Sequence, residues 1–233
     1  MKKKTVYAII LAAGSGTRMQ ADVTKQKMLI CGKSIIYRSV CAFYDNSLVD
    51  GIIIVGRADE LDYLRSELAD FSSKITAIVA GGDTRFDSAR LGFCAAPAGA
   101  DFVAIHDGAR PLITQRVITS VIEAAFLHGA ATDAEPVFDT VKRIDNRGMI
   151  TGTVDRNTLV RARTPQVFES GMYARALAHA GNGVGMTDDN SIVEAIGVSV
   201  YAVKSDEPNP KITTRSDIGY AEYLLKEREQ PDV

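Results

Sequence analysis

Apolar and polar residues are distributed along the first 130 residues in a way that separates strands from helices. Four short apolar runs, each followed by glycine or polar residues, predict buried strands at 6–13, 51–56, 74–80 and 101–105. The segments that follow them have apolar residues at helical spacing and predict helices at 34–45, 58–71, 84–96 and 115–130. Strands that alternate with helices favour crossover connections and therefore an α/β fold with a mostly parallel sheet.

The pattern changes after residue 132. Residues 137–144 alternate between apolar and polar, 146–148 form the turn signal Asn-Arg-Gly, and 149–154 predict a returning strand. The resulting hairpin, about 136–156, is charged and lies outside the strand–helix alternation, so it either packs on its own domain or reaches a partner. The remaining predicted elements are helices at 170–180, 191–195 and 216–229 and a strand at 198–203. Residues 1–233 are expected to form a single domain with this one hairpin.

The first predicted strand leads into a glycine-rich loop that carries two cations. Gly14 and Gly16 let backbone N–H groups approach a ligand closely, and such a turn forms a concavity that favours anions. Arg18 and Lys25 add the positive charge that phosphate binding needs. Met19 at the third glycine position excludes a dinucleotide fingerprint, and the chain contains no Walker string. The alternative is a plain tight turn, which has no use for both cations.

Two further polar clusters follow predicted strands, at 81–88 and 106–110. Ligands of parallel sheets bind beyond the carboxyl ends of the strands, so both clusters are expected beside the glycine loop. In the first, Asp83, the backbone amides and the Ser88 hydroxyl suit recognition of a base edge; the alternative is a helix start with Asp83 as N-cap. In the second, Asp107 suits Mg²⁺ coordination or polarisation of a phosphate substrate; the alternative is an ion pair with Arg110 that holds the loop.

Composition argues against several classes of partner. The 233-residue chain has a net charge of −2 and no basic surplus, so no nucleic acid is expected to bind. No apolar run reaches the ~20 residues of a membrane helix. Lys2 to Lys4 before a short apolar run imitate a signal peptide, but the run leads into polar residues and is interpreted as a strand. The cysteines have no C-x-x-C spacing and the histidines no zinc spacing. We therefore predict a cytoplasmic protein.

A series of short motifs connects the chain to a known family. In chain order they are LAAGSGTRM, TKQ, GGDTRFDS, IHDGARP, PVFDTVKR, VDRNTL, TPQVF, TDDNSIVEAIG and KITTRSDI. The series resembles the 2-C-methyl-D-erythritol 4-phosphate cytidylyltransferases of the non-mevalonate isoprenoid pathway over residues 6–225. No single motif is decisive, but their order is specific. The resemblance implies a nucleotidyltransferase-type sheet with helices on both faces and a protruding β-arm, about 136–156, that builds a homodimer.

The resemblance also implies a reaction and a set of site residues. CTP and 2-C-methyl-D-erythritol 4-phosphate would give a CDP-linked alcohol and pyrophosphate, with Mg²⁺. The implied nucleotide-binding residues are Ala13, Gly14 and Gly16 for the phosphates and Gly82, Asp83 and Ser88 for cytosine. The implied catalytic cations are Arg18, Lys25 and Lys211. The implied polyol phosphate residues are Asp107, also the candidate metal ligand, Arg110, Thr164 and Thr187, with Thr140 and Arg156 from the partner's arm.

Three positions depart from the family pattern. Thr24 stands where proline usually precedes the lysine, which predicts a more mobile Lys25. Arg163 replaces a glutamine before the TPQ motif and adds a guanidinium near the predicted phosphate pocket. Pro210 lacks a backbone donor in the segment before Lys211. These departures bear on the identity of the alcohol phosphate more than on the type of reaction.

Alternatives therefore stand beside the predicted enzyme. Thr187 also suits a helix cap, Lys211 a surface lysine, and the charges of the hairpin a solvated ribbon. A ribitol 5-phosphate cytidylyltransferase is the alternative enzyme with the same frame. A non-catalytic nucleotide sensor is the alternative from another class, against which Arg18 and Lys25 speak.

Overall fold

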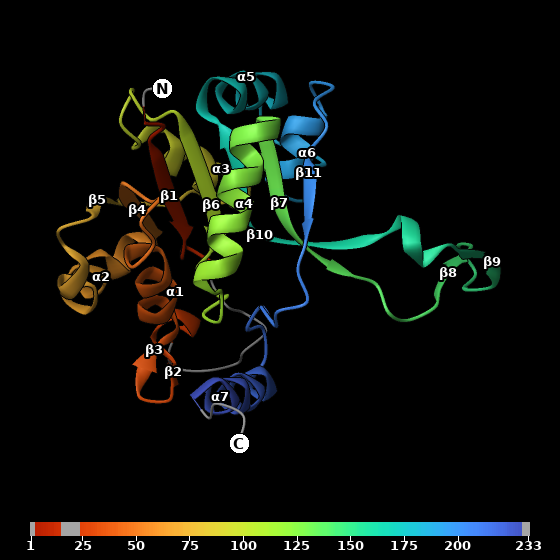
Figure 1. The fold of residues 1–233 in the computed structure, drawn as a ribbon, viewed down its shortest axis with the longest axis horizontal. Coiled ribbons are helices and arrows are strands. Elements are labelled where there is room, and N and C mark those ends of the chain that lie inside the picture. The colour runs from red at the N-terminus through yellow and green to blue at the C-terminus, as the bar shows by residue number, and fades with distance from the viewer. Residues whose placement is uncertain (1–2, 15–23, 230–233) are drawn as a thin grey trace.

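The computed structural model describes residues 3–14 and 24–229, which are organised around one seven-stranded sheet (Figure 1). The strands are β1 (Val6–Leu11), β4 (Gly51–Gly56), β5 (Ile75–Ala80), β6 (Phe102–Asp107), β7 (Ala130–Pro136), β10 (Val160–Glu169) and β11 (Tyr201–Lys204). They lie in the order β11-β7-β10-β6-β1-β4-β5. β10 is antiparallel to β6 and β7, whereas the other pairings are parallel. The predicted mostly parallel sheet is confirmed.

β1 lies inside the sheet because both of its faces are apolar. Ala8 and Ile10 pack in one cluster of buried side chains, and Ile9 and Leu11 pack in another on the opposite face. The first cluster is covered by α1 (Ile35–Tyr44), α2 (Leu61–Glu67) and α4 (Gln115–His128). The second is covered by α3 (Arg85–Cys94), α5 (Ser170–Ala180) and α6 (Asp189–Glu194). Helices cover both faces, as predicted, and each fully buried isoleucine contributes about 1.5–3 kcal/mol.

Short polar side chains determine where the helices begin. The Ser34 hydroxyl accepts a backbone N–H of the first turn of α1, and the Thr114 hydroxyl does the same for α4. α3 begins after Thr84, whose Oγ1 accepts the N–H of Asp87 at 3.0 Å. The predicted cap, Asp83, is one residue too early, because Thr84 has the extended backbone of an N-cap (φ −115°, ψ 166°). Asp83 is thereby left exposed beyond the helix.

Two strands that the sequence did not predict complete the sheet. The sequence of β7, AATDAEP, is poor in the residues that favour strands, and β10 contains Pro165, which argues against one. Tertiary pairing decides both cases: β7 is held between β10 and β11, and Pro165 falls within a register shift between Ala162 and Gln166. The strand predicted at 198–203 is β11, Tyr201–Lys204.

The helix predicted at 58–71 is divided into three pieces. They are η3 (Ala58–Glu60), α2 and η4 (Ala69–Phe71). The breaks occur because Glu60 and Leu68 have backbone angles outside the helical range (φ −119°, ψ 4° and φ −104°, ψ 15°). The first break leaves Glu60 at a turn, buried and close to the start of α2.

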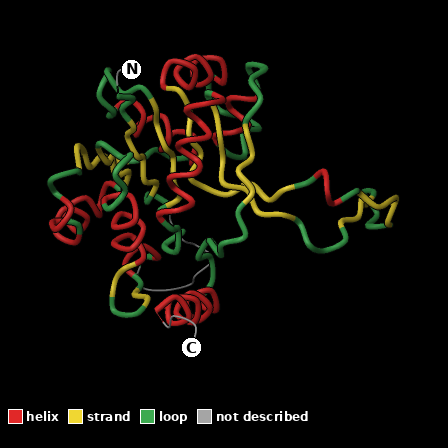
Figure 2. Tube along the Cα trace, in the orientation of Figure 1, coloured by secondary structure: helices red, strands yellow, loops and turns green. Residues whose placement is uncertain are grey.

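The hairpin predicted at about 136–156 extends away from the sheet as an arm (Figures 1 and 2). β7 and β10 lead into it, and β8 (Val141–Ile144) pairs with β9 (Ile150–Val154) in a separate two-stranded antiparallel sheet. η5 (Arg156–Thr158) leads back to β10. Four large apolar side chains of the arm are 63–71% exposed, namely Phe138, Ile144, Met149 and Ile150.

A third, smaller apolar cluster anchors the C-terminal helix, α7 (Arg215–Glu229). Ala221 of α7 packs with Leu112, Ile212 and the short hairpin of β2 (Leu29–Ile30) and β3 (Lys33–Ser34). This packing carries the segment before α7 toward the carboxyl ends of the strands. Within residues 3–14 and 24–229, no helix combines the length and the apolar character that crossing a bilayer would demand.

Candidate active site

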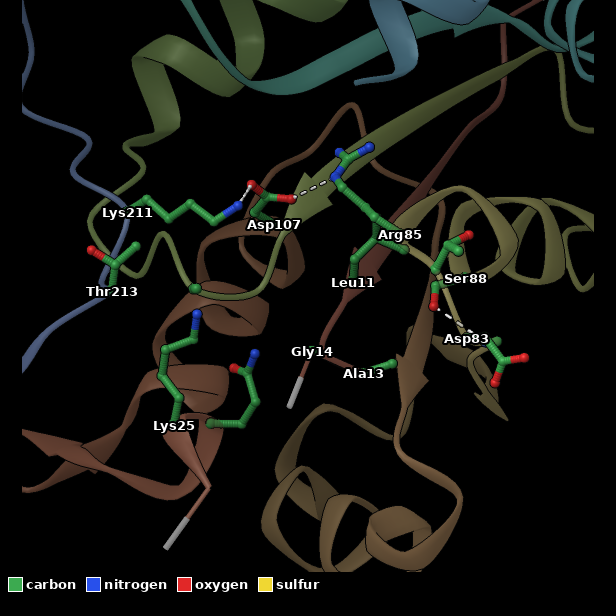
Figure 3. A pocket seen from close by; sticks show the side chains of 14 residues that line it. Leu11, Ala13, Gly14, Lys25, Asp83, Arg85, Ser88, Asp107, Lys211 and Thr213 are labelled. Atoms are coloured by element: carbon green, nitrogen blue, oxygen red, sulfur yellow. Dashed lines mark hydrogen bonds and ion pairs between the residues drawn. The ribbon is translucent and has the colours of Figure 1, made fainter. Parts of the chain in front are cut away.

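A cleft of about 370 Å³ lies beyond the carboxyl ends of β1, β5 and β6 (Figure 3). Its lining residues are Leu11, Ala13, Gly14, Lys25, Gln26, Gly82, Asp83, Thr84, Arg85, Ser88, Asp107, Ala109, Lys211 and Thr213. Lys25, Lys211 and Thr213 lie on one side, and Ser88 and Asp83 lie on the other (Figure 3). The three polar clusters that follow predicted strands therefore meet in one place, as the strand-end rule requires.

The side of the cleft next to α3 depends on close backbone approach. A Cβ atom at Gly81 would lie 2.5 Å from the Cβ of Ala13 and 2.7 Å from Oγ of Ser88, so no larger residue fits there. The N–H of Gly82 donates to the Ser88 hydroxyl at 3.2 Å. This contact fixes the orientation of a hydroxyl that would otherwise rotate, and it places Ser88, Gly82 and Asp83 along one wall.

Asp107, at the end of β6, is surrounded by cations. Its Oδ2 accepts from Nζ of Lys211 at 2.7 Å, its Oδ1 accepts from Nε of Arg85 at 3.3 Å, and Nε of Arg110 is 3.9 Å from Oδ2. Burial alone would raise the pKa of Asp107, but the charges of Arg85, Lys211 and Arg110 outweigh burial and hold that pKa well below its usual range. Asp107 is therefore a permanent carboxylate, and the net charge of the cluster is positive.

Arg85 is a site residue that the sequence did not single out. Its Nη1 donates to Oδ2 of Asp189 at 2.7 Å, and Oδ1 of Asp189 accepts from the hydroxyl of Tyr173 at 2.5 Å. Asp189 is fully buried, so the guanidinium bridges an inner carboxylate and Asp107 at the cleft. Burial lowers the pKa of Arg85, but the two carboxylates outweigh it and raise that pKa above its usual value. The only signal in the sequence is that Arg85 lies within the cluster at 81–88.

A hydrogen-bond chain beneath Asp107 contains the buried His106. Its Nε2 lies 3.2 Å from the carbonyl oxygen of Arg110, which can only accept, so Nε2 carries the proton. Nδ1 then accepts from the Thr164 hydroxyl at 3.0 Å, and the same hydroxyl oxygen accepts the N–H of Asp107 at 3.1 Å. Burial lowers the pKa of His106 to about 4, so the ring is neutral. Thr164, predicted to line the site, is instead buried under it.

The opposite side of the cleft is a single 3₁₀ turn, η2 (Lys25–Lys27). Lys25 and Gln26 line the cleft, and Gln26 is only 4% exposed. No residue in the described part of the chain donates a hydrogen bond to its Oε1. Thr24, which precedes the turn in place of the family's proline, is held by its side chain, because its hydroxyl donates to Oε1 of Glu60 at 2.6 Å.

Five other predicted residues are not among the described residues that line this cleft. Gly16 and Arg18 fall in the segment 15–23, outside the described residues. Thr187 is exposed beside α6, whose N-cap is Asp188. Thr140 and Arg156 are exposed on the arm, where the Arg156 guanidinium donates to the carbonyl oxygen of Phe138. Within one chain, then, the structure does not bring the arm residues to the cleft (Figure 1).

Arg110 lies in a neighbouring cleft of about 460 Å³ that shares Lys211 with the first. Arg163 also borders it but is only 4% exposed. Nε of Arg163 lies 2.9 Å from Oδ2 of Asp133. The terminal guanidinium nitrogens donate to the carbonyl oxygens of Ser205 and Glu207. The predicted extra charge near a phosphate pocket is therefore compensated by Asp133. Arg163 holds the segment that leads to Lys211.

The described residues do not form a cation site by themselves. No group of three or more His, Cys, Asp or Glu side chains within them is placed to hold a metal ion. Both oxygens of Asp107 already accept from cations, and the other acid of the cleft, Asp83, lies on the far side (Figure 3). This donor set fits a Mg²⁺ ion that takes most of its ligands from phosphates and water, which is common for Mg²⁺.

Comparison with known proteins gives one consistent result. A model of the family described as "IspD: 2-C-methyl-D-erythritol 4-phosphate cytidylyltransferase" matches residues 6–227. A protein of that name from Caldanaerobacter subterraneus is 38% identical over 95% of this chain and 99% of its own. A bifunctional enzyme IspD/IspF from Desulfotalea psychrophila is 37% identical over 98% of this chain, which spans 58% of that protein. The crystal structure of 4-diphosphocytidyl-2C-methyl-D-erythritol synthase from Anaerococcus prevotii has a TM-score of 0.85 at 28% identity, covering 96% of this chain and 97% of its own.

Proposed function

Because the chain belongs to the 2-C-methyl-D-erythritol 4-phosphate cytidylyltransferase family, we propose that its cleft transfers CMP from CTP to that polyol phosphate. A phosphate oxygen of the polyol attacks the α-phosphorus of CTP, the bond from the α-phosphorus to the bridging oxygen breaks, and pyrophosphate leaves. The observation that carries the proposal is the cluster of Lys211, Arg85 and Arg110 around Asp107, in the same cleft as Lys25 and beyond the strand ends.

The chemistry suits a site built from fixed cations. The attacking group is already an anion, so a strong general base is not needed. Negative charge accumulates at the α-phosphorus and on pyrophosphate, and preorganised cations stabilise it without reorganisation. Lys25 and Arg18 act on the α-phosphate, and Lys211 acts with Asp107 on the incoming polyol phosphate. Holding both anions in line supplies much of the remaining rate enhancement.

CTP binds along the wall of the cleft next to α3. The backbone of Ala13, Gly14 and Gly16 binds phosphates, and the Gly82 backbone, Asp83 and the oriented Ser88 hydroxyl read the cytosine edge. The support is that a Cβ atom at Gly81 or Gly82 would lie 2.5 Å from the Cβ of Ala13 or 2.4 Å from the Cβ of Asp87, so this wall is closely packed. A purine is expected to be too large to fit beside it.

The polyol phosphate occupies the side of Lys25 and Lys211, near Arg110. Gln26 lines the same side, and its side-chain amide is the polar group there that we expect to meet a hydroxyl of the polyol. A Mg²⁺ ion would neutralise charge on the triphosphate, would take most of its ligands from CTP and water, and could take one from Asp107.

A homodimer completes the site through the arm. The support is the pair of observations that the arm exposes Phe138, Ile144, Met149 and Ile150 and that Thr140 and Arg156 lie away from the cleft of their own chain. Packing on a second subunit buries the apolar side chains, and it brings Thr140 and Arg156 to the polyol phosphate of the partner's cleft.

The experiment is release of pyrophosphate from CTP with each of two acceptors, 2-C-methyl-D-erythritol 4-phosphate and ribitol 5-phosphate. Rapid release is expected with the first and slow release with the second. Release with neither acceptor would contradict the enzyme proposal, and faster release with ribitol 5-phosphate would reassign the substrate. Replacement of CTP by ATP should abolish release, and equal rates would contradict the proposed cytosine reading.

A further inference from the structure

The turn that carries Lys25 is fastened at both ends to one carboxylate. η2 is a single 3₁₀ turn, and a turn of this length has little stability of its own. The Thr24 hydroxyl donates to Oε1 of Glu60 at 2.6 Å, and Nζ of Lys27 lies 3.1 Å from the same oxygen. Thr24 precedes the turn and Lys27 ends it. The two contacts therefore enclose the residues that line the cleft, Lys25 and Gln26.

Glu60 is built into the protein in a way that suits an anchor. Its side chain is 6% exposed, so both contacts are shielded from water and are stronger than a surface ion pair. It lies immediately before α2, whose Leu64 belongs to the main apolar cluster. Nζ of Lys27 also lies 4.6 Å from the ring centroid of Tyr63, a second residue of α2. The turn is thus attached to α2 and not only to its own chain neighbours.

We infer that Glu60 is a positioning residue for Lys25, acting through Thr24 and Lys27. The inference rests on the role proposed above for Lys25. A cation stabilises a transition state only if it is held where charge develops, and small misplacements are expensive in rate. Glu60 does not line the cleft, so its effect on turnover passes through the turn.

The backbone at residue 24 offers a second way to hold the same turn. Thr24 has φ −62° and ψ 146°, and this φ lies within the range that a proline ring enforces. Proline at this position would restrict the backbone without any hydroxyl. The hydroxyl–Glu60 contact and a proline ring are therefore alternative restraints on one conformation, which makes a rescue experiment possible.

The test compares two substitutions of Thr24. Thr24→Val keeps the shape and removes the hydroxyl, and kcat is expected to fall about tenfold while KM for CTP changes less than about twofold. Thr24→Pro also removes the hydroxyl, but kcat is expected to return to near the wild-type value. Tyr37→Phe is the matched control: it removes another hydroxyl-to-carboxylate contact, from Tyr37 to Asp70 at 3.2 Å, and leaves kcat unchanged.

A second pair of variants tests Glu60 itself. Glu60→Met, which is similar in size, is expected to lower kcat about tenfold, and adding Thr24→Val should lower it less than about twofold further, since Glu60→Met already removes the contact that Thr24→Val removes. Melting temperatures of all variants show whether each is folded. Should Glu60→Met fail to fold, the Val and Pro variants of Thr24 still decide the matter.

Lys25→Met, measured beside these variants, separates the positioning role of Glu60 from the catalytic role proposed for Lys25. If Lys25→Met is inactive while Thr24→Val and Glu60→Met turn over at the wild-type rate, the positioning role is overturned and the proposed function stands. If Thr24→Pro is as slow as Thr24→Val, restraint of the turn is not what Thr24 provides, and the inference is overturned as well. If Lys25→Met is fully active, the role of Lys25 fails, and the positioning role fails with it.

Discussion

The cleft and the arm differ in how their polar and apolar groups are satisfied. At the inner end of the cleft, Asp107 is paired with Lys211 and Arg85, and Arg85 is paired again with the buried Asp189. In the arm, β8 and β9 pair with each other, and Ile144 and Ile150 face solvent. A two-stranded ribbon is marginally stable alone in water. The charges at the inner end of the cleft are paired within one chain, whereas the large apolar side chains of the arm are exposed in one chain.

Among the changes considered, removal of the Lys25 charge should lower turnover the most. Lys25→Met is expected to lower kcat about 10³-fold and to change the Kd of CTP less than about threefold, because the charge acts mainly in the transition state. Lys33→Met, which removes an exposed lysine from the β2–β3 hairpin, serves as control and should behave as wild type. Stopped-flow pyrophosphate release and CTP titration measure the two quantities. A loss confined to CTP binding would make Lys25 a ground-state ligand.

Mixing two inactive variants should show whether the arm serves the partner's cleft. Arg156→Ala is expected to lower turnover about 10²-fold because one charge-assisted phosphate contact is lost. After subunit exchange with Lys25→Met, half of the dimers are mixed, and each mixed dimer has one cleft with neither defect. Activity should recover to about a quarter of wild type. Exchange proven by tagged subunits without recovery would place Arg156 in its own chain's cleft or in none.

Charges placed on the apolar side of the arm should separate assembly from folding. Ile144→Asp together with Ile150→Asp is expected to weaken dimerisation at least about 10²-fold, since two apolar side chains that the proposed interface would bury are replaced by charges. The melting temperature of the main sheet should stay within about 2 °C of wild type, because both residues are already solvent-exposed in the single chain. Sedimentation and calorimetry check the two statements. Unchanged dimerisation would exclude this face of the arm from the interface.

The smallest expected effect is on the pH dependence of stability, and it comes from His106, which lies beneath the cleft. Burial depresses the pKa of His106 to about 4, so between pH 6.5 and pH 4 the unfolded chain binds a proton that the folded chain does not. Stability contributed by neutral His106 is complete above about pH 6.5 and falls as the pH drops, by about 2 kcal/mol between pH 7 and pH 5. His106→Gln should flatten the urea-unfolding stability over this range. His179→Gln, at an exposed position, should retain the wild-type slope.

The sequence predicted which segments meet at the cleft better than it predicted which side chains pair with one another there. Gly14, Gly82 and Asp107 each come at or just after the end of a mostly apolar strand, and the strand-end rule brings such positions together without further information. Arg85 was missed because its partner, Asp189, is 104 positions away and is connected to it only by folding. Thr164 was placed in the cleft because the family resemblance implied it, yet its hydroxyl is used by His106 and Asp107 beneath the cleft.

Pairing between residues far apart in the chain also explains why two strands were missed, and its absence explains why the arm was predicted correctly. β7 and β10 were not predicted because β7 contains polar residues and β10 contains a proline. Their polar side chains are accommodated in the sheet by partners on other strands, as Asp133 is by Arg163. No local pattern reveals a partner 30 residues away. The arm was recognised from its turn and alternation alone, since both strands and the turn are contiguous in the chain.

The antiparallel setting of β10 makes the arm separable from the rest of the molecule. Pro136 and Val160, where the chain leaves and re-enters the sheet, are paired residues on β7 and β10. Paired residues of antiparallel strands lie about 5 Å apart, a gap that a short turn spans. The arm is therefore an elaborated hairpin loop, and a change in its length or sequence alters what it presents to a second subunit while the register of the sheet stays the same.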